Sequence, residues 1–242
     1  MGEIAYDFAA YRVLVVGGTR GVGLEVAHAF ADSGATVCVT GTMMLRELYD
    51  ADLSRFDYEM VNLARQESID NLAVSLGEVD IAVVAAGANL PYALPPSERD
   101  FIGGAVLSGL LGPGYLARKL RLRLAQSPAP GGGVMVLTGG ARRWWEIAQT
   151  PDEASKSLRE LTSRTAEGWV TLGARFNSVL EPDRPPSFFP RQASSQGRST
   201  AHRSGDLLVR DQPRLQQAVT DATLFLASES AARLNGQVLQ LS

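Results

Sequence analysis

A glycine-rich turn follows the first strongly apolar segment of the chain and leads into a segment of helical period. The apolar segment is Val13–Val16, and glycines stand at Gly17, Gly21 and Gly23. Glycines at such positions let the backbone turn tightly from a strand into a helix and approach a pyrophosphate, whose charge is favoured at the helix N-terminus. The turn therefore predicts a dinucleotide site within an α/β fold, and the competing interpretation is a merely structural Gly-rich turn.

The rest of the chain alternates short apolar runs with longer helical segments, which is the pattern of a parallel sheet covered on both faces. We expect strands at 13–16, 36–40, 56–61, 81–86, 134–138, 174–180 and 238–241, and helices at 22–33, 64–76, 101–124, 151 onward and 214–228. A flexible Gly112-Pro113-Gly114 interrupts the third of these helices. The sequence predicts one doubly wound domain over residues 1–242.

One segment breaks this alternation. Residues 181–213 are rich in Pro, Ser and Arg and show little periodicity, so they are predicted to form a mobile insertion.

Charge and cysteine content exclude several classes of protein. The 242 residues carry a formal net charge of −3, which gives no electrostatic case for a nucleic-acid or anionic-membrane partner. The lone Cys38 cannot form an internal disulfide, and with only His28 and His202 present a Cys/His metal site is not expected. No run of about 20 apolar residues and no signal peptide is visible, so we expect a cytoplasmic protein without a membrane partner.

The spacing Gly-x-x-x-Gly-x-Gly at 17–23 resembles that of the short-chain dehydrogenases/reductases. Ala154-Ser155-Lys156 resembles the active-site helix of that family, Asn177-Ser178-Val179 its Asn-Ala-Val strand, and Asn235-Gly236-Gln237-Val238 its last turn and strand. The resemblance covers essentially the whole chain. It implies a single Rossmann domain with a seven-stranded parallel sheet of order 3-2-1-4-5-6-7 and helices on both faces.

The resemblance also implies a cofactor site, made of Gly17, Thr19, Arg20, Gly21, Val22, Gly23, Thr42, Asn62, Leu63, Ala86, Gly87 and Lys156. The end of the second strand distinguishes NAD from NADP, because an acidic residue there binds the ribose 2′-OH and repels a 2′-phosphate. This chain has Thr40-Gly41-Thr42 at that point, and Arg20 precedes Gly21 as in NADP users. The expected cofactor is NADP(H), although Arg20 is also consistent with a solvated surface arginine.

The catalytic residues of the family are largely missing. The family has a Tyr four residues before the lysine and a Ser thirteen residues before that Tyr, where this chain has Asp152 and Gly139. Where the family has an Asn on the long helix before the active-site helix, this chain has Gly109. Where the family has the Pro-Gly that holds the nicotinamide carboxamide, this chain has Glu181-Pro182. The sequence keeps the residues that contact the diphosphate and lacks those that support hydride transfer.

Three other side chains are candidates for the chemistry. Asp152 begins a helix and Lys156 lies one turn later, so the helix dipole and an ion pair both lower the pKa of the carboxyl group. Asp152 is then a poor acid but a credible base, and a purely structural helix-start carboxylate is an equal alternative. Thr138 could supply a hydroxyl group to the substrate or simply bond the backbone.

Aromatic pairs point to a hydrophobic substrate. In the resembled fold, Trp144 and Trp145 belong to the loop that forms one wall of the substrate cleft, and Phe188 and Phe189 belong to the insertion 181–213, which could close as a lid. Packing or interface roles are the alternatives for both pairs. We expect a small hydrophobic carbonyl compound as the substrate.

Three hypotheses of function follow. The first is a non-redox enzyme of secondary metabolism, a cyclase, isomerase, dehydratase or aldol-type enzyme, with Asp152 as base and Lys156 as electrostatic stabiliser. The second is a catalytically silent NADP(H)-binding subunit that pairs with an active homologue; homodimers or homotetramers through the long helix and the active-site helix are also expected. The third is an NADPH-dependent oxidoreductase that works without the Tyr.

Overall fold

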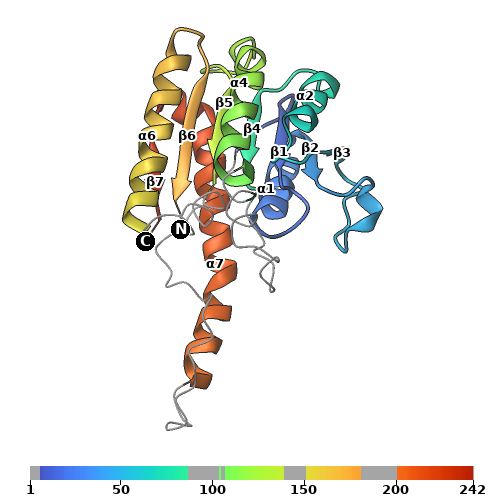
Figure 1. The fold of residues 1–242 in the computed structure, drawn as a ribbon, viewed down its shortest axis with the longest axis vertical. Helices are drawn as coiled ribbons and strands as arrows, with labels where there is room; N and C mark the ends of the chain where they lie inside the picture. Colours follow the sequence, from blue (N-terminus) through green and yellow to red (C-terminus); the bar gives the residue numbers. More distant parts are fainter. Residues whose placement is uncertain (1–5, 87–103, 105–106, 139–150, 181–200, 242) are drawn as a thin grey trace.

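Seven parallel strands form one sheet in the computed structural model, in the order β3-β2-β1-β4-β5-β6-β7 (Figure 1). The structure describes residues 6–86, 104, 107–138, 151–180 and 201–241, and within these it leaves out the side chains of 110, 151, 152, 154 and 201–213. The strands are β1 (Arg12–Val16), β2 (Thr36–Gly41), β3 (Asp57–Met60), β4 (Ile81–Val84), β5 (Val134–Leu137), β6 (Arg175–Leu180) and β7 (Val238–Gln240). The predicted doubly wound fold and its strand order are confirmed.

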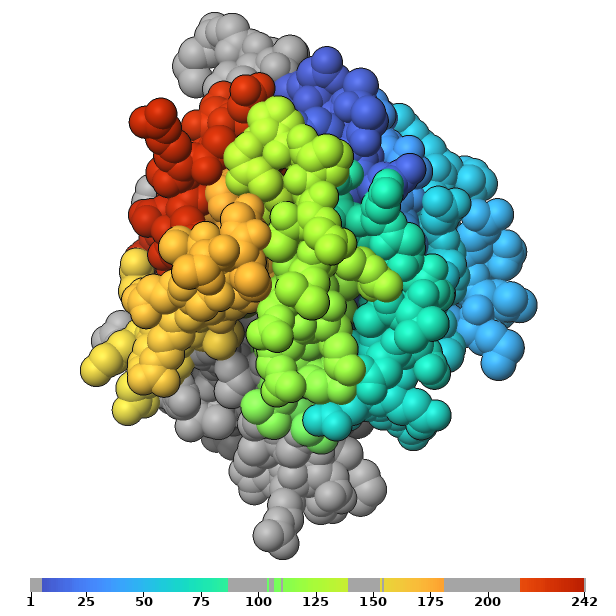
Figure 2. All heavy atoms as spheres, turned by 90° about the horizontal axis from the view of Figure 1, so that it is seen from above, coloured from blue at the N-terminus to red at the C-terminus, as the bar shows by residue number. Residues whose placement is uncertain are grey.

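Helices cover both faces of the sheet. They are α1 (Gly21–Asp32), α2 (Gln66–Ser75), α4 (Gly112–Ala125), α6 (Pro151–Val170) and α7 (Ala201–Ala227), with short turns η1 (Arg46–Leu48), η2 (Leu107–Leu111) and η3 (Glu229–Ala231). One face carries α1 and α7, and the other carries α2, α4 and α6. Figure 2 shows α4 at the surface between α2 and α6. None of the helices in the described part of the chain has the length and apolarity needed to span a membrane.

The two faces share their core through alternating residues of the central strands. Val13 and Val15 of β1 pack against α1 and α7, whereas Leu14 and Val16 pack against the α2, α4 and α6 side. All four side chains are at most 2% exposed. Burial on both faces explains why these strands read as continuous apolar runs rather than as an alternating pattern.

The last long helix begins earlier than the sequence predicts. The expected helix was 214–228, but α7 already begins at Ala201 and passes through Pro213. Residues 201–212 contain good helix formers and no proline, and one lost backbone hydrogen bond at Pro213 does not end a helix of 27 residues. The predicted insertion 181–213 is thus helical from Ala201 onward, and its remaining part, 181–200, lies outside the described residues.

The segment Gly112-Pro113-Gly114 is the beginning of α4 and not a flexible interruption. The single π-helical turn η2 ends at Leu111, and Pro113 occupies the first turn of α4, where its missing N–H costs nothing. A Cβ atom at Gly112 would lie 2.3 Å from the carbonyl oxygen of Leu63. Gly112 is therefore required for the close approach of α4 to the loop after β3.

A buried arginine ties the C-terminal part of the chain to the sheet. Arg175 of β6 is 4% exposed. Its guanidinium group donates hydrogen bonds to the carbonyl oxygens of Gly131 at 3.2 Å, Leu226 at 2.9 Å, Ala231 at 2.9 Å and Leu234 at 3.3 Å. One cation thereby satisfies carbonyl groups at the end of α7 and around η3.

We predict that Arg175→Met destabilises the fold by about 3 kcal/mol, because it leaves several buried carbonyl groups without a donor. Urea unfolding of the two proteins measures the difference. The control is Arg12→Met, since Arg12 pairs with Glu78 at the surface, where a single ion pair contributes less than about 1 kcal/mol. Equal stabilities of the two variants would contradict the assignment.

Candidate functional site

The glycine turn packs directly against the end of β4. Gly17 and Gly21 have positive φ angles of 82° and 54°. A Cβ atom at Gly17 would lie 2.7 Å from the backbone N and Cα of Ala86, and one at Gly23 would lie 2.2 Å from the carbonyl oxygen of Gly17. No side chain fits at residues 17 and 23, so the turn has the close-packed form that brings backbone N–H groups to a phosphate.

Hydrogen bonds join the turn to the carboxyl ends of the neighbouring strands. The N–H of Gly17 donates to the carbonyl oxygen of Thr40 at 3.2 Å, and the N–H of Ala85 donates to the carbonyl oxygen of Val16 at 2.9 Å. In the loop after β3, the N–H of Val61 donates a hydrogen bond to the carbonyl oxygen of Gly41 in β2 at 2.8 Å. Open α/β sheets bind their ligands at this edge, where the strand order reverses between β1 and β4.

Most residues predicted to hold the cofactor lie around this edge. Thr19 is buried in the turn, Val22 is half-buried in α1, and Leu63 is buried beside the start of α4. Thr42 and Arg20 are exposed at the same edge. The structure therefore brings together, at one edge of the sheet, these residues that were predicted to contact the cofactor.

Asn62 lies in the loop after β3 and is exposed, and its polar groups hold that loop. Its side-chain oxygen accepts the N–H of Ala64 at 2.9 Å, and its own N–H donates to the hydroxyl of Ser68 at 2.9 Å. Asn62 thus shapes the start of α2, and the exposed side of its amide group remains accessible to a ligand.

The catalytic candidates are less completely placed. Asp152 and Lys156 lie in the first turns of α6, as predicted, with Lys156 exposed; the side chain of Asp152 is not described. Thr138 is buried at the end of β5, and its hydroxyl donates to the oxygen of Val84 at 3.3 Å. Gly87, Gly139 and both aromatic pairs (Trp144 with Trp145, and Phe188 with Phe189) lie outside the described residues. Within the described residues, no three His, Cys, Asp or Glu side chains group as metal ligands.

The Tyr-x-x-x-Lys spacing that α6 lacks occurs instead on α4, at Tyr115 and Lys119. The Tyr115 hydroxyl lies 3.0 Å and 3.2 Å from the two carboxylate oxygens of Asp70 on α2, and the Lys119 ammonium lies 2.6 Å from one of them. The hydrogen bond from Lys119 is the main cause that lowers the pKa of Asp70. Both groups are thus engaged in fastening α2 to α4, and the spacing does not mark a proton-transfer pair.

Two tyrosines near the cofactor edge were not identified from the sequence. Tyr49 and Tyr58 approach the end of β2 from the loop after it and from β3, and the Tyr49 hydroxyl accepts the N–H of Met43 at 2.9 Å. No motif or periodicity links Tyr49 to this strand end, because an irregular loop brings it there.

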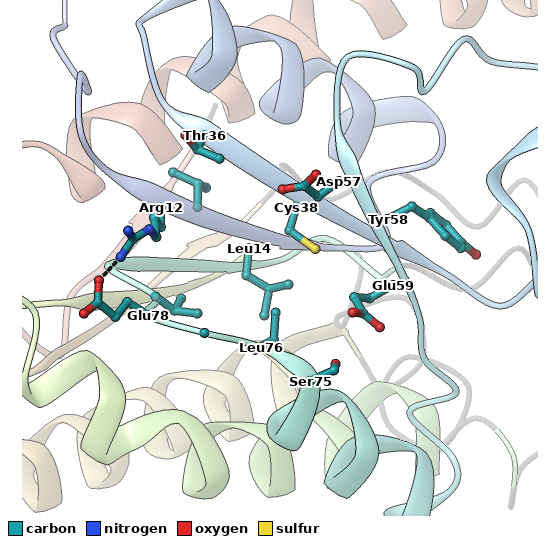
Figure 3. Close-up of a pocket in the computed structure, with 13 residues that line it drawn as sticks. Arg12, Leu14, Thr36, Cys38, Asp57, Tyr58, Glu59, Ser75, Leu76 and Glu78 are labelled. Carbon is teal, nitrogen blue, oxygen red and sulfur yellow. Dashed lines mark ion pairs between the residues drawn. The ribbon is translucent and has the colours of Figure 1, made fainter.

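A cavity of about 720 Å³ lies at the opposite edge of the sheet, between β1–β3 and the end of α2 (Figure 3). Arg12, Thr36 and Asp57, the first residues of their strands, line it, so it is separate from the dinucleotide turn. The Cys38 sulfur lies on the side of the sheet that faces this space, as does Leu14 (Figure 3). Ser75, the last residue of α2, and the segment 76–79 that follows it form the other wall.

Comparisons with known proteins find distant relatives over almost the whole chain. No protein-family model matches it. The chain is 20% identical to a 2-dehydro-3-deoxy-D-gluconate 5-dehydrogenase of Formosa agariphila, over 97% of this chain and 92% of that protein. It is 24% identical to a probable 2,4-dienoyl-CoA reductase of Caenorhabditis elegans, over 97% of this chain and 80% of that protein.

Solved structures share the fold. A putative betaketoacyl-ACP reductase is 25% identical, with a TM-score of 0.68 and 98% of each chain covered. A short chain dehydrogenase/reductase family protein is 24% identical, with a TM-score of 0.66 and 97% of each chain covered. A Pseudomonas aeruginosa RhlG/NADP active-site complex is 17% identical, with a TM-score of 0.70, and 98% of this chain and 97% of that chain are covered. The names of the relatives favour the oxidoreductase hypothesis and give no support to a non-redox enzyme.

We predict that Gly23→Ala abolishes dinucleotide binding, because the added methyl group would overlap the Gly17 carbonyl oxygen and displace the turn. Gly168→Ala is the matched control, since a Cβ atom there meets nothing within 4 Å, and alanine stabilises a helix by about 0.5–1 kcal/mol over glycine. Calorimetric titration with NADPH measures binding, and circular dichroism checks that each variant folds. A folded Gly23→Ala protein with unchanged affinity would contradict the role of the turn.

Cys38 is predicted to be an unreactive thiol. Burial, with smaller contributions from Glu59 and Asp57, raises the pKa of the thiol to about 12. The thiolate is the nucleophile, so alkylation by iodoacetamide at pH 8 should be about 100-fold slower than for an ordinary cysteine and should accelerate as the pH rises toward 12. Mass spectrometry of the native and urea-unfolded protein measures both rates, and similar rates would show that the thiol is accessible and ionised.

Proposed function

We propose that this chain is a nicotinamide-dinucleotide-dependent oxidoreductase. The proposal builds on the resemblance to the short-chain dehydrogenases/reductases, which the fold and the relatives confirm. The observation that carries the proposal is the glycine turn at residues 17–23, which is closed against the end of β4 at the carboxyl edge of the sheet. The oxidoreductase names of the relatives add to it.

The residues present fit a dinucleotide. Backbone atoms occupy the space that a Cβ atom would need at Gly17 and Gly23, so the turn is as tight as a phosphate-binding turn must be. The N-terminus of α1, whose first N–H groups have no acceptor within the helix itself, faces the same edge. The strand end Thr40-Gly41-Thr42 presents no carboxylate to repel a 2′-phosphate, and Arg20 follows Thr19, whose methyl group lies against Gly41. These features favour NADP(H) over NAD(H).

The absence of a tyrosine at residue 152 points to the kind of substrate. When bound, the nicotinamide supplies or accepts a hydride. Reduction of an isolated carbonyl group leaves an alkoxide, a strong base that needs a positioned acid. Reduction of a conjugated enoyl carbonyl leaves an enolate, whose charge is delocalised and which a nearby cation can stabilise until a proton arrives from a weak acid or water. We therefore propose an α,β-unsaturated carbonyl compound as the substrate, a class that includes the dienoyl-CoA named for one relative.

Lys156 is the cation in this proposal. It lies exposed near the start of α6, one turn after Asp152. Its ammonium group would stabilise the developing enolate, and Asp152 would hold the ammonium in place as a carboxylate. This reaction does not require Asp152 to act as the base that the non-redox hypothesis assigns to it.

The test is an NADPH oxidation assay with paired substrates, an enoyl thioester and the saturated ketone of similar size. We expect turnover with the enoyl thioester and little with the ketone. Lys156→Ala should lower kcat/KM about 100-fold, because the lysine stabilises charge that develops in the transition state. Titration of the variant with NADPH measures how much of that loss comes from weaker cofactor binding, to which the resemblance also assigns Lys156.

Two outcomes would contradict the proposal. Absence of NADPH binding would remove the dinucleotide-dependent function altogether. Conversion of a carbonyl substrate without any oxidation of NADPH, abolished by Asp152→Asn, would instead favour the non-redox enzyme.

A further inference from the structure

The last residue of β2 has no side chain, and a hydroxyl group from another segment fills its place. In doubly wound nucleotide-binding folds, a side chain at the end of the second strand contacts the adenosine ribose. Here Gly41 stands at that position, and a Cβ atom on it would lie 2.1 Å from the Tyr49 hydroxyl oxygen. The same Cβ atom would lie 2.8 Å from the methyl group of Thr19, so the phosphate turn, the strand end and Tyr49 meet at one point.

The Tyr49 hydroxyl is held in place by the segment around it. The N–H of Met43 donates to its oxygen at 2.9 Å, and the Tyr58 hydroxyl lies 3.5 Å away while also donating to the carbonyl oxygen of Met43. The two rings are tilted against each other with centroids 6.0 Å apart. A hydroxyl fixed in this way is preorganised for a ligand, because little rotational freedom remains to be lost on binding.

The hydrogen bonds also give the hydroxyl a direction. Burial raises the pKa of Tyr49, but hydrogen bonds from Tyr58, Met43 and Thr42 outweigh that effect and lower it. Tyr58 donates its one proton to the carbonyl oxygen of Met43, and its hydroxyl lies 3.5 Å from that of Tyr49, at the limit of a hydrogen bond. The Tyr49 oxygen accepts the N–H of Met43, so the Tyr49 proton can turn to a stronger acceptor outside the cluster. A phenol with a lowered pKa is a better donor than an ordinary one, and a phosphate oxygen is the strongest acceptor that a dinucleotide offers.

From this geometry we infer that Tyr49 is the residue that selects the cofactor, by donating a hydrogen bond to the 2′-phosphate of NADP(H). The inference deepens the proposed function and rests on it. Tyr49 takes the position that a carboxylate holds in NAD-dependent proteins, and it replaces a repelling charge by a neutral donor. Gly41 is then required because any side chain there would displace the hydroxyl.

Two fragments of the cofactor test the role of Tyr49 without turnover: adenosine 2′,5′-bisphosphate and adenosine 5′-monophosphate, each titrated by calorimetry. For Tyr49→Phe we expect the bisphosphate to bind about ten-fold more weakly, the cost of one hydrogen bond to a charged group, and the monophosphate to change less than about two-fold. Gly41→Ala should reproduce the selective loss, because its methyl group displaces the same hydroxyl.

Tyr115→Phe is the matched control, since it removes a phenolic hydroxyl that hydrogen-bonds to Asp70 on α2 and should leave both affinities unchanged. Equal weakening of the two fragments by Tyr49→Phe would mean that the hydroxyl only shapes the loop, and would overturn the inference while leaving the proposed function intact. Unchanged affinity for the bisphosphate would also overturn it. If the unaltered protein binds neither the fragments nor NADPH, the proposed function itself fails.

Discussion

The contact between the glycine turn and the end of β4 is the constraint on which the site depends. Gly17 and Gly23 leave no room for a side chain, because the backbone of Ala86 and the carbonyl group of Gly17 occupy that space. The same contact fixes where α1 begins, and therefore where its N–H groups point. One packing requirement thus fixes both where the turn lies and which way its N–H groups point. Hydrogen bonds between the ends of β1, β2 and β4 hold these strand ends in their relative positions.

The fold could be predicted from the sequence because its determinants are local. Buried parallel strands appear as apolar runs, and the glycine turn and the helix that begins at Pro151 have clear residue signals. The beginning of α7 and the role of Gly112 could not be predicted in this way. Pro213 suggests that the helix begins only after it, although α7 begins at Ala201 and passes through it. Gly112 is explained by its contact with Leu63, which is distant in sequence.

The candidate site likewise contains residues that the sequence predicts and residues that it does not. Residues 17–23 follow from their spacing, whereas Tyr49 reaches Gly41 through an irregular loop that leaves no pattern. The Tyr115 and Lys119 pair shows the opposite case, in which a familiar spacing serves helix packing through Asp70. A spacing indicates chemistry only when its groups lie at the ligand edge, and a residue without any spacing signal can still lie there.

The hydrogen bonds of the Arg175 guanidinium group have a consequence for how the chain folds while it is being synthesised. The guanidinium group belongs to β6, but three of its four carbonyl acceptors lie 51 to 59 residues later in the sequence and are synthesised after it. Until that later segment arrives, the Gly131 carbonyl oxygen is the one acceptor of these four that is present, and water must solvate the rest of the guanidinium group, which disfavours its burial in the sheet. An interrupted or clipped chain would consequently expose an open, charged sheet edge, which gives cellular proteases a means of distinguishing incomplete molecules from finished ones.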